Sequence, residues 1–556
     1  MKITVNNIML DLHQGARVKD AIMKFYSYQG KRIPKVFPVV NDEYGNKAGP
    51  EGALCEGNKL FILNRRRRRA STISFQTLLL ITLAFLPACR GSRDAAIIKE
   101  QERQAIIFAV NDIHAAIDNF PKLAYIVDSL KSVYPDMLLV SAGDNQTGNP
   151  VNDQYPEKGL PVIELMNASG FDLSAVGNHE FDTEQQGFVN LTHKADFSFI
   201  CANMSVTAPF DLKVEPFKII RLPNGLKLSF LGLVQLNQYG IPDSHPDKIK
   251  GFSFSSPFET ARDFLYLKNE SDIFIALTHL GFSNDVKLAE SMPEGIDLII
   301  GGHSHTRVEN EQVHNGILIT QAESKLKYGT LIRLSQNHEG VLHKSMELID
   351  IRNYAKEKPS VRAMVDKYND TPALREVIAT ATDDFSSHEE LGYLMADAQR
   401  NFAGADIALV NPGGVRIGNL SRGPITIMDV YQLDPFGNDL IVTKLTGHEI
   451  HSLMIAAYPV DGKDLLYPSG LRIQLRSDKD GNPEDFLLMT ENDTPLNLEN
   501  TYTVAMNNYM TSVYKYDHQD PGQSLFITSA DATIAWLKKI RNVKSYRGEK
   551  RIQIIK

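Results

Sequence analysis

The chain has 556 residues, of which 43% are hydrophobic and 23% are charged, and its formal net charge is −8. These values exclude a fibrous or mainly disordered protein, and the length corresponds to about three or four domains. An acidic balance gives no support to nucleic-acid binding, which needs a basic surface. Three scattered cysteines, Cys55, Cys89 and Cys201, are too few for a disulfide framework or a cysteine-based zinc site.

The first 63 residues have the pattern of a small separate unit. Alternating and helical apolar spacings predict a helix over residues 16–26 and strands over 1–5, 7–13, 36–40 and 59–63. This ββαββ order resembles a β-grasp, ubiquitin-like domain over residues 1–63. Sulfur carriers of that kind end in Gly-Gly, whereas this segment continues into Leu63-Asn64-Arg65, which disfavours a carrier role. We expect a structural or protein-interaction role with an unknown protein partner.

Residues 64–103 form an arginine-rich segment of the kind that targets a protein to a membrane. Five arginines, 65–69, precede an apolar run over 70–89, which is short for a spanning helix but typical of a signal. The run ends in Leu-Pro-Ala-Cys89, which resembles a bacterial lipobox. Five arginines disfavour a buried core helix. A polar spacer follows the run.

Three interpretations of this segment remain open. The segment can be an uncleaved signal-anchor with its arginines in the cytoplasm, a cleaved signal with Cys89 lipidated, or the leader of a chain that truly starts elsewhere. All three predict a bacterial cell-envelope protein whose catalytic part is periplasmic or extracellular. Membrane attachment would run through residues 70–89.

From residue 104 onward, strands and helices alternate. Apolar runs predict five buried strands, over 105–110, 137–141, 173–176, 272–277 and 296–300, with crossover helices such as 121–134 and 159–166. Each strand stops at a Gly, Asn, Asp or Thr, and a side chain able to bind a metal follows. Open α/β sheets place their ligand sites at the carboxyl ends of strands, so we expect these side chains to meet.

The predicted metal ligands combine carboxylates, imidazoles and one amide. Asp112 and His114 are two residues apart at a strand end and therefore point to the same side. The full set is too large for one tetrahedral zinc and suits two divalent ions, such as Zn, Mn or Mg. The candidate ligands are Asp112, His114, Asp144, Asn178, His279, His303 and His305.

The second half of the chain contains candidate ligand-binding motifs. A predicted strand over 405–410 is followed by Asn411-Pro-Gly-Gly-Val-Arg416, whose glycines permit close approach of the backbone to a ligand. Arg416 carries a forked cation suited to a phosphate or carboxylate. Phe436, within Asp434-Pro-Phe-Gly-Asn438, offers a flat face to a nucleobase.

The ordered metal motifs resemble the calcineurin-like metallophosphoesterase superfamily, and the whole of residues 104–556 resembles the 5′-nucleotidase family. The resemblance implies a four-layer α/β/β/α metallophosphoesterase domain over 104–355, a linker helix over 356–372 and an α+β substrate-binding domain over 373–556. It implies one metal on Asp112, His114, Asp144 and His305, and the other on Asp144, Asn178, His279 and His303. It also implies a catalytic pair, in which His179 contacts the phosphoryl group and Asp182 orients it.

The same resemblance implies that Asn411, Arg416, Phe436, Asn438 and Tyr509 bind the substrate. The sequence departs from the family pattern at two places in this substrate-binding region. Pro412 replaces the first glycine of the family motif, and Asn507 to Asp517 replaces its late Gly-Gly-Asp-Gly-Tyr segment. Tyr509, Tyr514 or Tyr516 is then a candidate for the second face of a base sandwich and Asp517 for the ribose contact, or these tyrosines only pack.

The sequence therefore predicts an exported dinuclear-metal phosphohydrolase that converts nucleotides to nucleoside and phosphate. One alternative is hydrolysis of other phosphoesters, such as nucleotide sugars or 2′,3′-cyclic nucleotides. A second is a non-catalytic nucleotide-binding surface protein, which the complete ligand set disfavours. We expect a hinge near residues 356–372, because the metals and the base pocket lie in different domains.

Overall fold

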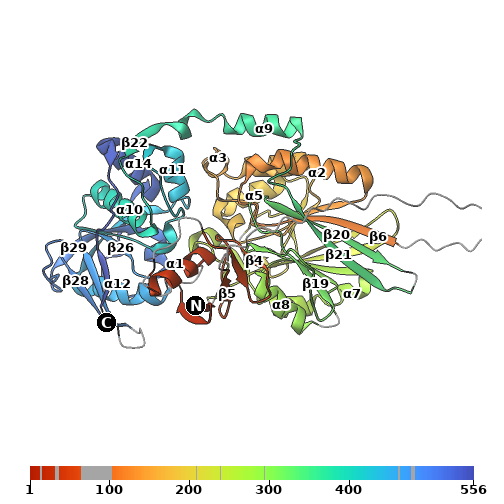
Figure 1. The fold of residues 1–556 in the computed structure, drawn as a ribbon, viewed down its shortest axis with the longest axis horizontal. Helices are drawn as coiled ribbons and strands as arrows, with labels where there is room; N and C mark the ends of the chain where they lie inside the picture. Colours follow the sequence, from red (N-terminus) through yellow and green to blue (C-terminus); the bar gives the residue numbers. More distant parts are fainter. Residues whose placement is uncertain are drawn as a thin grey trace, which may run out of the picture.

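The computed structural model describes residues 1–12, 16–29, 31, 37–63, 103–207, 209–237, 239–292, 295–337, 339–460, 464–477 and 483–555. The predicted targeting segment, including Cys89, lies outside these ranges apart from Arg103. Within them, no helix has the length and apolar character needed to cross a bilayer. Figure 1 shows two lobes, with the amino-terminal unit between them.

The first lobe contains two large sheets. The first runs in the order β11-β9-β8-β7-β6-β20-β21 and the second in the order β12-β13-β15-β16-β19-β18. The first comprises β6 (Arg103–Val110), β7 (Leu138–Ser141), β8 (Leu173–Ala175), β9 (Ser198–Ile200), β11 (Val214–Glu215), β20 (Tyr328–Gln336) and β21 (Leu342–Asp350). The second comprises β12 (Phe217–Arg221), β13 (Lys227–Val234), β15 (Ile273–His279), β16 (Leu298–Ile300), β18 (Gln312–His314) and β19 (Ile317–Thr320). A separate pair is β10 (Met204–Val206) and β14 (Phe252–Phe254).

Helices cover the outer faces of both sheets. The alternation along β6 directs Ile107 toward the second sheet and Phe108 toward the helices, so each face of the sheet is buried. The first sheet is covered by α2 (Phe120–Val133), α4 (Leu160–Ser169), α5 (Glu184–Lys194) and α9 (Pro359–Asn369). The second sheet is covered by α6 (Pro257–Asp263), α7 (Leu267–Glu270) and α8 (Phe282–Ser291). The predicted four-layer α/β/β/α order is confirmed.

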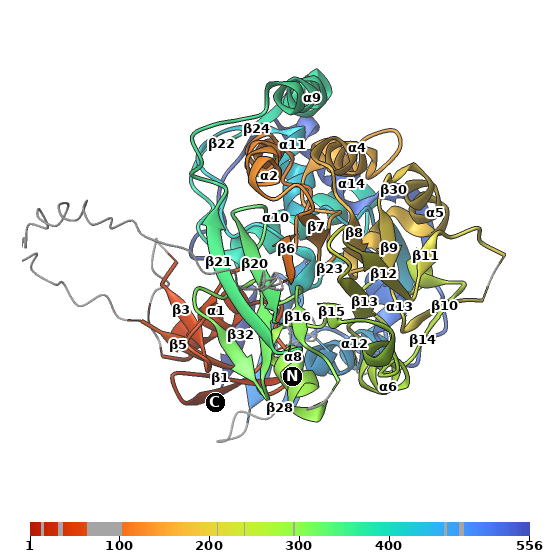
Figure 2. The ribbon, with the colours of Figure 1, turned by 90° about the vertical axis from the view of Figure 1, so that its right-hand side faces the viewer.

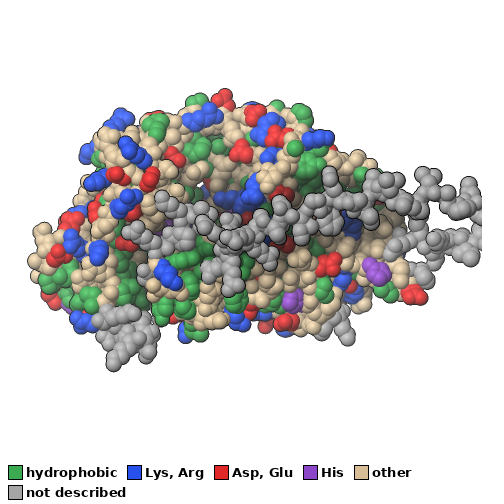
Figure 3. Space-filling view, viewed as in Figure 1, with side chains coloured by type: hydrophobic (Ala, Val, Ile, Leu, Met, Phe, Trp, Pro, Cys, Tyr) green, Lys and Arg blue, Asp and Glu red, His purple; other side chains and the backbone are tan. Residues whose placement is uncertain are grey.

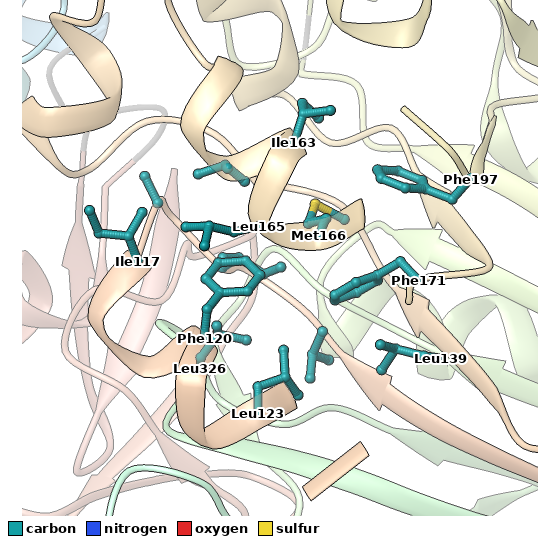
Figure 4. Packing of buried hydrophobic residues seen from close by; sticks show 14 of the residues in the cluster. Ile117, Phe120, Leu123, Leu139, Ile163, Leu165, Met166, Phe171, Phe197 and Leu326 are labelled. Atoms are coloured by element: carbon teal, nitrogen blue, oxygen red, sulfur yellow. The ribbon is translucent and has the colours of Figure 1, made fainter. Parts of the chain in front are cut away.

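Close packing fixes the helices on the first sheet. Figure 4 shows Phe120 of α2 beside Leu165 of α4, and Leu139 of β7 in the same cluster near Phe171. The side chains of Phe120, Leu165 and Leu139 are fully buried. Pro121 in the first turn of α2 and Gly170, with φ of 76° at the end of α4, are the residues expected at helix starts and ends. Short helices near these are η1 (Ile117–Asn119) and α3 (Pro150–Asp153).

The central strands of both sheets are parallel. β6 to β9 pair in parallel in the first sheet, and β13, β15, β16 and β19 do so in the second. Each of the five predicted strands is present, with ends within two residues of the predicted ones. Their carboxyl ends lie at a common edge of the two sheets, which positions the candidate site.

The second lobe is an α+β domain, as predicted. Its main sheet comprises β26 (Tyr467–Ser469), β23 (Ile407–Val410), β29 (Thr501–Asn507), β25 (Asp439–Thr446) and β30 (Gln523–Thr528), in that order. Two three-stranded sheets comprise β24 (Gly423–Thr426), β22 (Val377–Ala381) and β31 (Asn542–Val543), and β28 (Pro483–Met489), β27 (Arg472–Ser477) and β32 (Ile552–Ile555). The helices are η4 (Pro372–Arg375), α10 (His388–Ala403), η5 (Pro412–Gly414), α11 (Ile427–Leu433), α12 (Gly447–Val460), α13 (Asn508–Val513) and α14 (Ser529–Ile540).

The amino-terminal unit packs α1 (Val18–Tyr28) on a small sheet. Its strands are β1 (Lys2–Val5), β2 (Ile8–Asp11), β3 (Val40–Asp42), β4 (Lys47–Ala48) and β5 (Lys59–Ile62). β1 pairs antiparallel with β2 and parallel with β5, and Ile22 and Phe25 of α1 are buried against them. The predicted strand over 36–40 is wrong for residues 37–39: β3 begins only at Val40, and Pro38 has no N–H to donate to a ladder.

Candidate active site

The structure brings the predicted metal ligands together at the shared sheet edge. Asp112 and His114 follow β6, Asp144 follows β7, and Asn178 precedes the short helix η2 (His179–Thr183) after β8. His279 is the last residue of β15, and His303 and His305 follow β16. Three groups have donor atoms within 4.8 Å of one another: Asp112, His114 and His305; His114, Asp144 and His179; and Asp144, His279 and His303.

The first predicted ion site is formed by donors after β6 and β16. His305 Nε2 lies 3.2 Å from Asp112 Oδ1 and 3.0 Å from His114 Nε2. His114 Nε2 lies 3.8 Å from Asp144 Oδ2, which connects this site to the second one. All four side chains are buried.

The second predicted ion site shares Asp144 with the first. His279 Nε2 lies 3.1 Å from Asp144 Oδ2, and His303 Nδ1 lies 3.1 Å from Asn178 Oδ1. Asp144 therefore faces both groups of imidazoles, as a bridging carboxylate must.

The surroundings of the imidazoles fit a metal. His279 Nδ1 bonds the Ala142 carbonyl at 2.8 Å and His114 Nδ1 bonds the Thr147 carbonyl at 3.0 Å, so each Nε2 faces the cluster centre. Among the described residues, the buried His279 Nε2 has Asp144 Oδ2 at 3.1 Å but makes no hydrogen bond of good geometry. A buried ring nitrogen in that position needs a cation or a proton to satisfy it.

The backbone at this edge is strained. Five of the ligands have positive φ angles: 49° at Asp112, 47° at His114, 52° at Asp144, 78° at His303 and 51° at His305. Non-glycine residues with positive φ cost free energy and persist where the surrounding structure requires them, often at functional sites. This strain favours a catalytic function for the edge.

The titration behaviour of the cluster is that of a ligand set. Burial alone would raise the pKa of Asp144, but the nearby His279 and His179 hold it well below its usual range. Burial, together with the charge of His279, lowers the pKa of His303 to about 3. Burial lowers the pKa of His279, but the nearby Asp144 carboxylate outweighs burial and raises the pKa of His279 to about 10. A metal bound there would therefore displace a proton.

His179 and Asp182 form the predicted pair beside this cluster. His179 Nδ1 lies 2.6 Å from Asp182 Oδ2, and the backbone N–H of His179 donates to Asp144 Oδ1 at 2.8 Å. Burial lowers the pKa of His179, but the carboxylates of Asp144 and Asp182 outweigh it and raise the pKa above its usual value. Burial acts to raise the pKa of Asp182, and the cations of Lys248 and His179 hold it low. The two carboxylates thus favour the cationic form of the imidazole.

One cavity of about 430 Å³ connects this pair to the second lobe. Its wall includes His114, His179, His303 and His305 on one side and the five predicted substrate-binding residues on the other, which are Asn411, Arg416, Phe436, Asn438 and Tyr509. The Arg416 guanidinium carbon lies 5.0 Å from the Phe436 ring centroid. The cavity thus joins a cationic, metal-competent end to an end with aromatic side chains.

The other candidates from the 507–517 segment lie elsewhere. Tyr514 is 1% exposed within the core of the second lobe, and Tyr516 packs against the same core. Asp517 is exposed and does not line the cavity. The packing interpretation therefore fits Tyr514 and Tyr516, and Tyr509 is the tyrosine of this segment that faces the cavity.

Sequence reasoning missed several residues that position the site. Glu180 accepts hydrogen bonds from the N–H groups of Gly177, Asn145 and Asp144 at 2.7, 2.8 and 3.1 Å. Burial raises the pKa of Glu180 to about 7. Its place directly after Asn178-His179 was the available signal.

Lys248 and two residues of the amino-terminal unit were also missed. Lys248, in η3 (Pro246–Ile249), lies 3.4 Å from Asp182 Oδ1 and donates to the Phe436 carbonyl at 3.1 Å. Arg17 and Glu51 line the same cavity from the amino-terminal unit. No motif surrounds these three residues, so no sequence signal indicated them.

Comparisons with known proteins agree with this geometry. Residues 106–307 match the calcineurin-like phosphoesterase family, and residues 374–514 match the 5′-nucleotidase C-terminal domain. The chain is similar to a trifunctional nucleotide phosphoesterase of Bacillus subtilis, at 26% identity over 80% of this chain and 34% of the relative. It is also similar to a 5′-nucleotidase of Vibrio cholerae, at 28% identity over 62% of this chain and 72% of the relative.

A solved structure extends the likeness to the fold. The 5′-nucleotidase precursor of Thermus thermophilus superposes with a TM-score of 0.68 at 25% identity, over 82% of this chain and 99% of that one. By contrast, the chain spans only about a third of the length of the Bacillus relative.

The two-sheet fold and the Asp/His cluster at its edge define a calcineurin-like phosphoesterase, a class of metal-dependent hydrolases. With the second domain included, the chain belongs to the 5′-nucleotidase family of these phosphoesterases.

Proposed function

We propose that this protein hydrolyses the 5′-phosphate ester of nucleotides to nucleoside and phosphate, using two divalent metal ions. The observation that carries the proposal is one cavity, lined by five of the seven predicted metal ligands, that also reaches Arg416, Phe436 and Tyr509. The likeness to a nucleotide phosphoesterase of Bacillus and to a 5′-nucleotidase of Vibrio supports the same substrate class.

The residues present fit two ions that share one carboxylate. Asp112, His114, Asp144 and His305 would hold one ion, and Asp144, Asn178, His279 and His303 the other. Two such ions, when bound, lower the pKa of a water nucleophile and neutralise charge on phosphoryl oxygens. Imidazole and carboxylate donors accept Zn and Mn alike.

The chain itself supplies charge and orientation to the reaction. Cationic His179 donates from its free ring nitrogen to a phosphoryl oxygen, where negative charge grows in the transition state. Asp182 fixes the imidazole through the 2.6 Å bond at Nδ1. At the other end of the cavity, Phe436 and Tyr509 offer aromatic faces to a base and Arg416 offers N–H donors.

A substrate panel tests this proposal. Phosphate release from AMP, a uridine diphosphate sugar, a 2′,3′-cyclic nucleotide and p-nitrophenyl phosphate would be measured with added Zn or Mn. We expect the highest kcat/KM with AMP. Release from the generic ester alone would contradict nucleotide specificity, and release from none would favour a non-catalytic binding protein.

The cellular location of the protein stays a prediction from sequence. Attachment to a bacterial cell envelope through residues 70–89, with or without a lipid on Cys89, depends on the arginine run and the lipobox-like ending alone. Mass measurement of the mature amino terminus tests it, since a lipidated Cys89 start and an intact Met1 start differ by 88 residues.

A further inference from the structure

The amino-terminal unit contacts the loop that carries two predicted metal ligands. β4 pairs antiparallel with β17 (Thr306–Arg307), directly after His305. The N–H groups of Gly49 and Ala53 donate to the carbonyls of His305 and His303 at 3.3 and 3.2 Å. The loop after His305 therefore adds the short edge strand β17 to the sheet of the amino-terminal unit.

The contact is close enough to require glycine at one position. A Cβ atom at Gly52 would lie 1.9 Å from the Ser304 carbonyl oxygen, which is backbone and cannot rotate away. Only glycine lets the two chains approach this closely. Asn58 Nδ2 also donates to Ser283 Oγ at 2.7 Å, so the contact involves several backbone and side-chain bonds.

The same unit reaches the second lobe. Lys24 Nζ lies 3.0 Å from Asp464 Oδ1, and Lys19 Nζ donates to the Arg416 carbonyl at 3.2 Å. Both contacts come from α1, which Figures 1 and 2 show beside the two lobes. Since Arg416 lines the cavity, α1 is anchored next to the substrate-binding wall.

Arg17, which directly precedes α1, faces the cavity from this anchored position. Its Nη1 lies 2.8 Å from Glu51 Oε2, and Lys19 Nζ lies 3.0 Å from the same oxygen. Burial would raise the pKa of Glu51, but Lys19 and Arg17 hold it well below its usual range. The ionised Glu51 orients Arg17 and leaves most of its five N–H donors available.

The charge balance favours an anion at this wall. Arg17 and Lys19 both pair with the one carboxylate of Glu51, and the charge of Lys325 also acts on it, so these four groups carry a net positive charge. Figure 3 shows Lys and Arg side chains gathered in the hollow between the lobes. The charge of Arg17 also reaches the imidazole of His179, where it opposes the two carboxylates.

We propose that the amino-terminal unit is a built-in wall of the active site and that Arg17 binds phosphate oxygens of the substrate and of the product. The inference depends on the proposed phosphohydrolase function. A forked guanidinium beside His179 adds two donors to a group with several anionic oxygens, which a metal-and-histidine site alone leaves partly unpaired. Arg17 thereby becomes a binding residue contributed by a domain outside the matched phosphoesterase regions.

The first test measures anion binding to the full chain. Arg17→Met and Arg17→Lys would be compared with Lys59→Met, which removes an exposed ion pair with Glu43 in the same unit. We expect Arg17→Met to raise KM for AMP and the inhibition constant of inorganic phosphate about tenfold or more, because a charge-assisted bidentate contact is lost. Arg17→Lys should recover part of the loss, and kcat should change less than KM.

A calorimetric titration with inorganic phosphate gives the same comparison without turnover. Unchanged phosphate affinity in Arg17→Met would overturn the inference while leaving the hydrolase proposal intact, provided that the wild-type chain cleaves AMP. If the wild-type chain cleaves no nucleotide, the hydrolase proposal fails, and a wild-type phosphate affinity lost in Arg17→Met would still support the binding wall.

The second test measures docking. Gly52→Ala should speed amide hydrogen exchange over residues 47–54, because the added Cβ separates the unit from Ser304. Gly418→Ala, whose Cβ would meet no atom within 4 Å, is the control. Exchange over 47–54 that is already fast in the wild-type chain, or unaltered by Gly52→Ala, would overturn the docked arrangement and with it the role of Arg17.

Discussion

Asp144 is the residue on which both predicted ion sites depend. It follows β7 and has a left-handed backbone conformation. Its side chain faces His114 and His279 and accepts a hydrogen bond from the backbone N–H of His179. An amide in its place keeps the shape but loses the negative charge that two cations share. Its neighbours would remain in place, because Glu180 holds the Asp144 backbone rather than its side chain.

Asp144→Asn should therefore lower phosphatase turnover by about a thousandfold or more, in the range expected when charge stabilisation in a catalytic site is removed. Bound metal per chain, measured by elemental mass spectrometry, should fall below two. Asp211→Asn is the matched control, since the Asp211 side chain is 90% exposed. Wild-type metal content together with wild-type turnover in Asp144→Asn would contradict the bridging role.

A substitution at His179 distinguishes a role in stabilising charge from a role in binding metal. His179→Gln keeps a hydrogen-bond donor but removes the cation, so we expect turnover to fall about 10²- to 10⁴-fold, the contribution typical of a positioned acid or base. Metal content should stay at the wild-type level, and this readout distinguishes the variant from Asp144→Asn. Loss of metal in His179→Gln would instead assign His179 to the ligand set.

Much of the site was predictable at the residue scale because every ligand follows a strand with a strong apolar pattern. The chain order of Asp112, Asp144, Asn178 and His279 then determines which side chains share an edge. Lys248 and Arg17 were not predictable, because their roles come from contacts with Phe436 and Glu51 that only the folded chain creates. The role of Tyr514 could not be predicted, because packing in a core and stacking on a base both favour aromatic side chains.

At the scale of elements, the loop that presents Phe436 depends on a buried carboxyl. Asp434 ends α11, and its side chain accepts a hydrogen bond from Ser529 at the start of α14. Burial raises the pKa of Asp434 to about 6. An acid with a raised folded-state pKa contributes stability at low pH, and this contribution is lost as the pH rises toward the folded-state value.

The free energy of unfolding should accordingly lose about 2–3 kcal/mol from this one group between about pH 4 and pH 7. Asp434→Asn abolishes the titration, so its stability relative to wild type should rise over that interval. Urea unfolding of the metal-free protein at a series of pH values measures this difference. A difference that is flat with pH would show that Asp434 does not titrate in this range.

Strands were predicted best where their residues are strongly buried, and least well where pairing with another strand determines their position. The parallel strands of the catalytic lobe have apolar runs that few other structures accommodate. β3 was misplaced because its pairing with β5 and the Pro38 constraint outweigh the local apolar pattern. β17 has only two residues and exists through its pairing with β4, for which the sequence carries no signal.

At the scale of the whole molecule, the docked amino-terminal unit constrains topology. It shares backbone pairing with the loop after His305, so the docked arrangement requires the unit and the catalytic lobe to lie in one compartment. An uncleaved signal-anchor across residues 70–89 would place them on opposite sides of a membrane, and cleavage before Cys89 would divide the chain. The docked arrangement therefore disagrees with a membrane-spanning anchor at residues 70–89, and the β-grasp assignment of the unit stays a prediction.

Intact-mass measurement and protease protection in cells test whether the unit and the catalytic lobe stay in one chain and on the same side of the membrane. We expect a chain that retains residues 1–63, with the unit and the catalytic lobe equally accessible to added protease. A mature chain that begins at Cys89 would contradict the docked arrangement and would support the lipoprotein interpretation. The two arms are independent of enzymatic activity.

The reaction that we propose is cleavage of nucleotide monophosphates with two metal ions at the Asp144 edge. The most direct measurement follows adenosine and phosphate release from AMP by the full-length protein before chelation, after chelation, and after addition of Mn or Zn. We expect equal amounts of the two products, loss of release after chelation, and recovery with about two ions bound per chain. Undiminished release by the metal-free protein, or no release from AMP with any added metal, would contradict it.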